Sequence, residues 1–259
     1  MRNDRHGAIG VFDSGVGGLT VLKALIDRLP RESTIYLGDT ARVPYGTKSE
    51  DVVTRYSLAN ARELSAHGIK MLVVACNTAS AMALPALSSL PIPVVGVIDP
   101  GARAAAEQTR VGKIAVIGTP GTISSGAYQR ALAAQNPRIE THVGACPLFV
   151  PLAEEGWTEG EIALLVARRY LTPELLLGVD TLLLGCTHYP LLSQVLREVV
   201  GPDVALVDSA AATADAVVEL LHNANLAAEP TSAPSHRFLV TDTPDRFLSV
   251  GSRFLGRKI

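Results

Sequence analysis

Two cysteines occur in matching contexts in this chain. Residues 71–80 are MLVVACNTAS and residues 181–190 are TLLLGCTHYP, so Cys76 and Cys186 each follow an apolar run and precede polar side chains. A thiolate accepts a proton and a thiol donates one. Two thiols on opposite sides of one carbon can therefore remove its proton from one face and deliver another to the opposite face. The pair predicts two-base proton exchange at a chiral carbon.

The polar neighbours of both cysteines fit an anionic substrate. Each cysteine precedes a segment expected to begin a helix, and a helix N-terminus lowers a thiol pKa and holds anions. The hydroxyl groups of Thr78 and Thr187, with nearby backbone N–H groups, can bind a carboxylate. His188 lies two residues after Cys186, where we expect a functional role for its imidazole.

Other uses of the cysteines fit the sequence less well. The chain has three cysteines, an odd and small number that argues against a disulfide framework. No CxxC or HExxH spacing is present, so no metal site is expected. Cys146 stands beside Pro147 without a polar flank, and we expect it to be structural. A dithiol redox protein built on Cys76 and Cys186 remains a competing hypothesis.

The elements around these residues alternate in type. Apolar runs alternate with segments of helical periodicity, which indicates an α/β fold with mostly parallel sheets. The expected strands are 8–13, 34–39, 70–76, 93–97, 113–119, 139–144, 181–186, 204–208 and 237–242. Expected helices include 19–29, 49–67, 121–135, 159–170 and 210–223, and residues 224–236 are expected to form a surface connection. Several strands end in polar residues, and ligands of open α/β sheets bind at the carboxyl ends of strands.

The two cysteine motifs belong to a longer internal similarity. Cys76 and Cys186 are 110 residues apart, and the segments 9–18 and 115–124 resemble each other with Asp13 and Thr119 106 residues apart. These offsets predict two versions of one βαβ-rich unit. If the two units face each other about a pseudo-twofold axis, both thiols point at one ligand in the cleft between two lobes.

Composition limits the classes of partner. The chain has 259 residues, is 47% hydrophobic and carries a formal charge of −2, with an isoelectric point near 6.3. It therefore has no basic field for nucleic acid or membrane lipid. No apolar run approaches the ~20 residues of a membrane-spanning helix, and the N-terminus lacks a secretory signal. We expect a cytoplasmic protein.

Four motifs together resemble a known family. These are DSGVGG (13–18), GDTARVPYG (38–46), ACNTAS (75–80) and LGCTHYP (184–190). In this order they are similar to the cofactor-independent aspartate/glutamate racemase family, and the resemblance extends from about residue 8 to the tail at 240–256. It implies two pseudo-symmetric α/β lobes, formed by residues 1–98 plus 208–259 and by residues 99–207.

The resemblance also implies roles for particular residues. Cys76 would deprotonate the D-enantiomer and Cys186 the L-enantiomer, with Asp13 beside the first thiol and His188 beside the second. Glu155 falls where a second assisting carboxylate is expected, and the adjacent Glu154 is an alternative. The implied substrate contacts are Asp13, Ser14, Tyr45, Gly46, Asn77, Thr78, Thr187 and His188.

The activity that the resemblance implies is interconversion of L- and D-glutamate without pyridoxal phosphate or metal. Its product would supply peptidoglycan, and hence cell-wall biogenesis and cell shape, in a bacterial cytoplasm. The resemblance also implies a homodimer. Two alternatives stay open: a racemase of another amino acid such as aspartate, and a non-catalytic amino-acid-binding module. Nucleotide binding is not expected, because DSGVGG lacks both the G-x-G-x-x-G spacing and the P-loop lysine.

Overall fold

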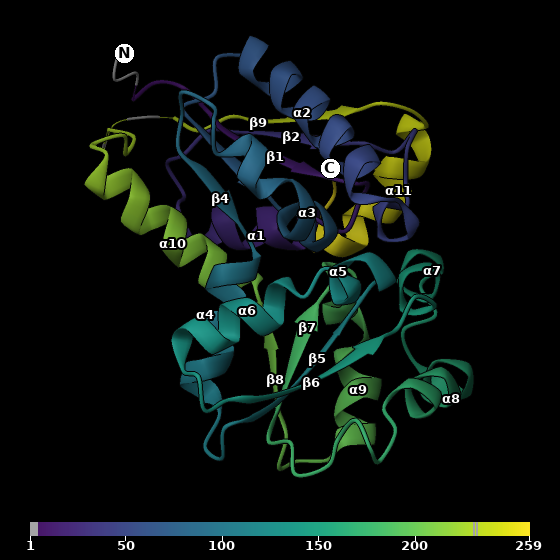
Figure 1. Ribbon diagram of the computed structural model, residues 1–259. Coiled ribbons are helices and arrows are strands. Elements are labelled where there is room, and N and C mark those ends of the chain that lie inside the picture. The colour runs from purple at the N-terminus through teal and green to yellow at the C-terminus, as the bar shows by residue number, and fades with distance from the viewer. Residues whose placement is uncertain (1–4, 230, 232) are drawn as a thin grey trace.

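The computed structural model describes residues 5–259 apart from 230 and 232, and its strands form two parallel sheets in two lobes (Figure 1). In spatial order the first sheet consists of β4 (Val94–Gly96), β3 (Met71–Val74), β1 (Ile9–Asp13), β2 (Thr34–Gly38) and β9 (His236–Val240). The second consists of β6 (Glu140–Ala145), β5 (Lys113–Gly118), β7 (Thr181–Gly185) and β8 (Ala205–Asp208). The predicted fold class is confirmed.

Helices flank both sheets (Figure 1). Those of the first lobe are α1 (Leu19–Arg28), α2 (Glu50–Ala66), α3 (Asn77–Leu87), α10 (Ala210–Asn223) and α11 (Pro244–Leu255). Those of the second lobe are α4 (Ile98–Gln108), α5 (Pro120–Ser124), α6 (Ala127–Gln135), α7 (Phe149–Glu155), α8 (Gly160–Tyr170) and α9 (Ser193–Val200). Short 3-10 turns, η1 (Tyr45–Thr47) and η2 (Tyr189–Leu192), complete the elements.

The internal similarity is visible in the strand order. The first sheet runs β2-β1-β3-β4 and the second runs β6-β5-β7-β8, so strands pair in the same order, and β9 is added beside β2. Phe12 pairs with Val74 and Ile117 with Leu184, and each pairing lies two residues before a cysteine. The register therefore matches Asp13 to Gly118, an offset of 118 − 13 = 105, so the predicted match to Thr119 is wrong by one residue.

Two expected helical segments differ from the structure for local reasons. The expected helix 121–135 is interrupted between α5 and α6, where Gly126 takes a left-handed conformation with φ +68°. Glycine adopts this conformation without a steric penalty from a Cβ. After Cys186 the segment YPLL forms the 3-10 turn η2 before α9 begins, with Pro190 in its first turn.

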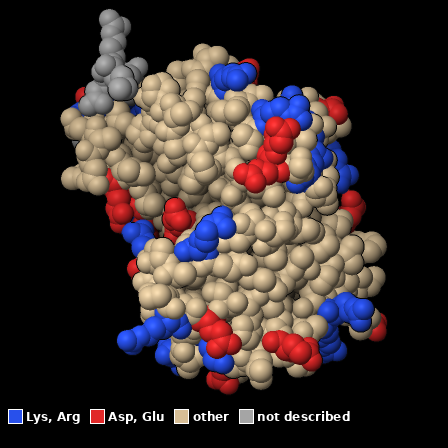
Figure 2. Space-filling view, in the orientation of Figure 1, with Lys and Arg blue, Asp and Glu red and all other residues tan. Residues whose placement is uncertain are grey.

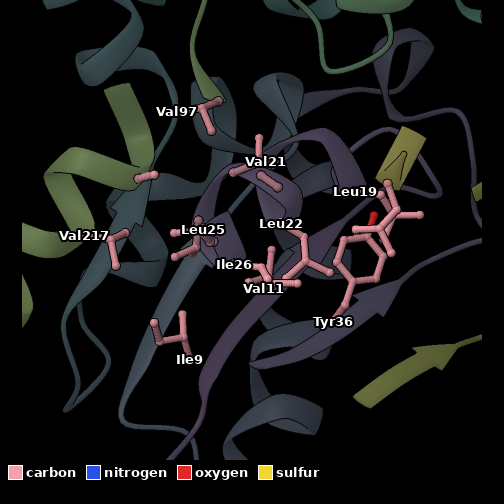
Figure 3. Packing of buried hydrophobic residues seen from close by; sticks show 14 of the residues in the cluster. Ile9, Val11, Leu19, Val21, Leu22, Leu25, Ile26, Tyr36, Val97 and Val217 are labelled. Atoms are coloured by element: carbon pink, nitrogen blue, oxygen red, sulfur yellow. The ribbon is translucent and has the colours of Figure 1, made fainter. Parts of the chain in front are cut away.

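The first lobe is held together by an apolar layer between its sheet and its helices. All residues of β1 are buried, and its Ile9 and Val11 share one apolar cluster with Leu22, Leu25 and Ile26 of α1 (Figure 3). Val217 of α10 joins the same cluster. Each fully buried side chain of this kind contributes roughly 1.5–3 kcal/mol. Because β1 and β3 are covered on both faces, they are apolar over most of their length, which is why they stood out in the sequence.

The chain passes from the first sheet to the second between β4 and β5. β8 belongs to the second sheet, and β9 returns the chain to the first. The lobe bounds 1–98 plus 208–259 and 99–207 stay a prediction. Acidic and basic side chains are interspersed on the face shown in Figure 2, in keeping with the small net charge. Within the described part of the chain, no helix has the length and apolar character that a membrane crossing requires.

Candidate active site

One pocket lies where the two lobes meet, and both predicted thiols line it. Its lining residues are Ser14, Val43, Pro44, Tyr45, Gly46, Cys76, Asn77, Thr78, Thr119, Val150, Cys186, Thr187 and His188. Every residue expected to contact substrate is in this set except Asp13, which is fully buried behind it. Sequence reasoning missed Val43, Pro44 and Val150 as lining residues.

The fold delivers the two cysteines from equivalent positions. Cys76 follows β3 and is the N-cap of α3, and Cys186 follows β7 directly before the turn that leads to α9. Both thiols are reduced and buried, with 6% and 7% of their surface exposed. Each lobe thus contributes one thiol to the same pocket.

Cys76 lies in a setting that favours its protonated form. Burial and the neighbouring Asp13 raise the pKa of the Cys76 thiol to about 12, although the Ala79 N–H and the Ser14 hydroxyl oppose this shift. The Cys76 Sγ lies 3.7 Å from Ser14 Oγ. Asp13 accepts a 2.8 Å hydrogen bond from the Gly15 N–H, and burial raises the pKa of its carboxyl. At neutral pH Cys76 is suited to donate a proton.

Cys186 has a different partner. Its sulfur lies 3.8 Å from His188 Nδ1, and His188 Nε2 lies 3.1 Å from Glu154 Oε1. Burial alone would lower the pKa of His188, but hydrogen bonds to Cys186 and Glu154 outweigh it and raise this pKa to about 10. Burial opposes ionisation of Glu154, but His188 and Arg246 hold the pKa of this carboxyl below its usual value. The His188 imidazolium and the Glu154 carboxylate therefore form a partly buried ion pair beside Cys186.

The carboxylate next to His188 is Glu154. Glu155, which the resemblance placed in the assisting role, is 60% exposed and pairs with Arg246 at 3.4 Å. Both residues lie near the end of α7, and only Glu154 reaches His188, because adjacent helical positions point in different directions. The structure therefore brings Glu154, the predicted alternative, next to His188, whereas Glu155 points to Arg246.

Sequence reasoning missed the connection of this carboxylate to α11. Arg246 lies 3.3 Å from Glu154 Oε2, and Arg253 donates to the Glu154 carbonyl oxygen. Arg246 and Arg253 are seven residues apart, so they share one face of α11, which lies next to α7 across the lobes (Figure 1). That spacing was the available signal in the sequence.

Glycine at position 17 permits the close approach of the two lobes. A Cβ added to Gly17 would lie 2.2 Å from Thr187 Oγ1 and 2.4 Å from His188 Nδ1. No side chain fits in this space. The glycine-rich segment after β1 therefore brings backbone of the first lobe against the polar residues that follow Cys186.

Most hydroxyl groups at the pocket are already hydrogen-bonded within the protein. The Tyr45 hydroxyl donates to Asp39 Oδ2 at 2.5 Å and accepts from Asn60 Nδ2 at 3.1 Å. Thr78 Oγ1 lies 2.9 Å from Thr119 Oγ1, a contact that joins the lobes. Because these hydroxyls are engaged, side-chain donors that face the pocket without a partner matter more for binding.

The chain is similar to known proteins over most of its length. The family model described as Asp/Glu/Hydantoin racemase matches residues 9–217. The chain belongs to the Asp/Glu/hydantoin racemase family. A member named glutamate racemase, from Geobacter metallireducens, is 60% identical over 253 residues, which cover 97% of this chain and 94% of that protein. The resemblance expected from the four motifs is confirmed.

Solved structures of family members have the same fold. A glutamate racemase isoform of Bacillus anthracis superposes with a TM-score of 0.94 at 42% identity, covering 98% of this chain and 96% of that one. The glutamate racemase of Francisella tularensis, solved in complex with D-glutamate, gives a TM-score of 0.92 at 39% identity, covering 98% and 95%. The two-lobed architecture is therefore shared with these racemases.

Proposed function

We propose that this racemase-family chain interconverts L- and D-glutamate with two thiols and without a cofactor. The observation that carries the proposal is that Cys76 and Cys186, from equivalent strand ends of the two lobes, line one pocket. Relatives with 60% and 51% identity over 97% of this chain bear the name glutamate racemase, which supports the choice of substrate.

The environments of the two thiols support a division of roles. Starting from L-glutamate, the Cys186 thiolate takes the α-proton, and the Cys76 thiol gives its proton to the opposite face of the same carbon. D-glutamate leaves, Cys186 is then a thiol and Cys76 a thiolate, so protons balance. In the reverse direction Cys76 abstracts and Cys186 delivers. The imidazolium of His188, 3.8 Å from Cys186, supports the thiolate stage at that sulfur.

The α-proton of an amino acid is weakly acidic, so the site must stabilise the carbanion-like transition state. Backbone N–H groups at the start of α3, the Asn77 amide and the segment after Cys186 are donors that can hold the substrate carboxylate. One preorganised donor of this kind contributes about 3 kcal/mol. Exclusion of water from the buried pocket strengthens each of these interactions.

The decisive assay is circular dichroism of D-glutamate mixed with the purified protein and no additive. We expect the signal to decay to zero as the mixture becomes racemic, and the α-hydrogen to exchange with solvent in D₂O. Cys76→Ala and Cys186→Ala should each abolish racemisation, whereas Cys146→Ala should retain it. Cys146 is the matched control, because it is also buried but does not line the pocket. Full activity in either of the first two variants would refute the two-thiol mechanism.

The same assay separates the competing hypotheses. Faster racemisation of aspartate than of glutamate would identify an aspartate racemase. Binding of glutamate without any exchange of its α-hydrogen in D₂O would identify a binding module. Loss of both free thiols with formation of a Cys76–Cys186 disulfide during turnover would favour the redox hypothesis.

The proposal extends to the cell. The chain would act as a homodimer in the cytoplasm of a bacterium. Its D-glutamate would supply peptidoglycan and so support cell-wall biogenesis and cell shape. Depletion of the chain in its host should cause lysis that added D-glutamate prevents. Sedimentation at micromolar concentration should give the mass of two chains.

A further inference from the structure

Asn77 carries an unused side-chain donor beside the pocket. The residue is 2% exposed and lines the pocket beside Cys76. Within the described residues its Nδ2 group has no hydrogen-bond partner, whereas the neighbouring Thr78 hydroxyl bonds to Thr119 and Thr122. A buried amide donor without a partner is costly, commonly about 1–3 kcal/mol. The cost is recovered when a ligand supplies an acceptor.

The orientation of this amide is set from the other lobe. The hydroxyl of Tyr128, on α6, donates to Asn77 Oδ1 at 2.6 Å. Tyr128 is 1% exposed. Its bond occupies the amide oxygen of Asn77 and leaves the amide nitrogen without a partner among the described residues.

Packing fixes the position of the Tyr128 ring. A Cβ on Gly185 would lie 2.9 Å from Tyr128 Cε2, so the ring rests directly on the backbone before Cys186. A Cβ on Gly101 would lie 3.4 Å from the Tyr128 hydroxyl oxygen. The hydroxyl thus has little freedom to move away from Asn77. Tyr128 itself is not among the residues that line the pocket.

We propose that Tyr128 is a positioning residue that holds the Asn77 amide with its N–H groups toward the pocket, where they bind a carboxylate oxygen of the substrate. This inference rests on the proposed function, because it assigns a role in binding glutamate. Tyr128 belongs to the second lobe and Asn77 to the first, so the contact forms only in this arrangement of the lobes. Carboxylate recognition is therefore coupled to the approach of the lobes.

The test of this inference removes the hydroxyl group of Tyr128. In Tyr128→Phe the ring stays in place and the Asn77 amide loses the bond that fixes it, so it can turn its oxygen toward the substrate carboxylate. We expect KM for glutamate to rise roughly 10-fold, as for the loss of one hydrogen bond, with a smaller change in kcat.

A double-mutant cycle separates positioning from a general structural effect. In an Asn77→Ala background the amide is absent, so adding Tyr128→Phe should change KM no further. If Tyr128→Phe raises KM by the same factor in the wild-type chain and in the Asn77→Ala variant, the inference is overturned. It is also overturned if Tyr128→Phe alone leaves KM unchanged. Tyr170→Phe is the control: its hydroxyl accepts from the Leu148 N–H outside the pocket, and we expect no change in KM.

The activity of the wild-type chain separates a failure of this inference from a failure of the proposed function. If it does not racemise glutamate, the proposed function fails, and the cycle is then run on glutamate affinity by calorimetry. If it is active and Tyr128→Phe behaves as wild type, only the role of Tyr128 fails. Thermal unfolding of every variant checks that folding is retained. If Tyr128→Phe does not fold, Asn77→Ala alone tests the amide donor, and an unchanged KM for glutamate would overturn the inference.

Discussion

Replacing Gly17 by alanine tests whether the contact between the lobes controls the chemistry. The added Cβ would lie 2.2 Å from Thr187 Oγ1 and 2.4 Å from His188 Nδ1, whereas ordinary contacts are 3.4 Å or longer. The segment after Cys186 must therefore move by about 1 Å. A displacement of that size at reacting groups costs on the order of 100-fold in rate. Overpacking of this kind costs typically 1–3 kcal/mol of stability.

The assay combines racemisation rate with chemical denaturation, and it has a control within the same loop. A Cβ on Gly15 would lie 3.4 Å from the nearest atom, a Val43 methyl group, so Gly15→Ala should keep near-normal activity. Gly17→Ala should lose about 100-fold in kcat/KM while it remains folded. If both variants are equally active, the close approach at Gly17 is not required and the geometric argument is refuted.

Two further predictions concern the groups behind Cys186. Glu154→Gln should lower kcat roughly tenfold or more, because the carboxylate that supports the imidazolium is lost. Glu155 is exposed, so Glu155→Gln should stay near wild type. If Glu155→Gln is the more damaging change, the assisting role belongs to Glu155, as the resemblance implied. The raised pKa of His188 means that the folded state favours its protonated form. Its contribution to the free energy of unfolding is complete below about pH 6.5 and is lost as pH rises through about 10. Denaturation at several pH values should show this decline, and His188→Gln should flatten it; an unchanged slope would contradict the assignment.

Much of the fold was predictable because parallel strands covered on both faces are apolar along their whole length. The runs before Cys76 and Cys186 stood out for this reason, and both proved to be buried strands of equivalent position. The polar residues after them were expected at the carboxyl ends of strands, where the structure places them around one pocket. The predicted match of Asp13 to Thr119 was wrong by one residue, because similarity between two short segments does not fix how their strands align with neighbouring strands.

Interactions between the lobes could not be predicted, because they join residues far apart in the chain. Glu154 and Glu155 are both acidic and adjacent, and the choice between them depends on where α7 meets His188 and α11. Likewise Tyr128 carries no motif in the sequence. Its hydroxyl reaches Asn77, 51 residues away, only because α6 and α3 approach across the cleft.

These contacts also indicate why the site has two unlike halves despite the internal repeat. The position equivalent to Asp13 in the second unit is a glycine, Gly118, so the carboxylate that accompanies Cys76 has no counterpart there. Instead, the assisting groups of Cys186 come from His188, two residues along the chain, and from Glu154 on α7. The two matching thiols therefore have unlike neighbours: burial and the Asp13 carboxyl group favour a proton on Cys76, and an ionised pair lies beside Cys186. For an exchange that needs one acid and one base at a time, this asymmetry supplies the two starting states that symmetric halves would lack.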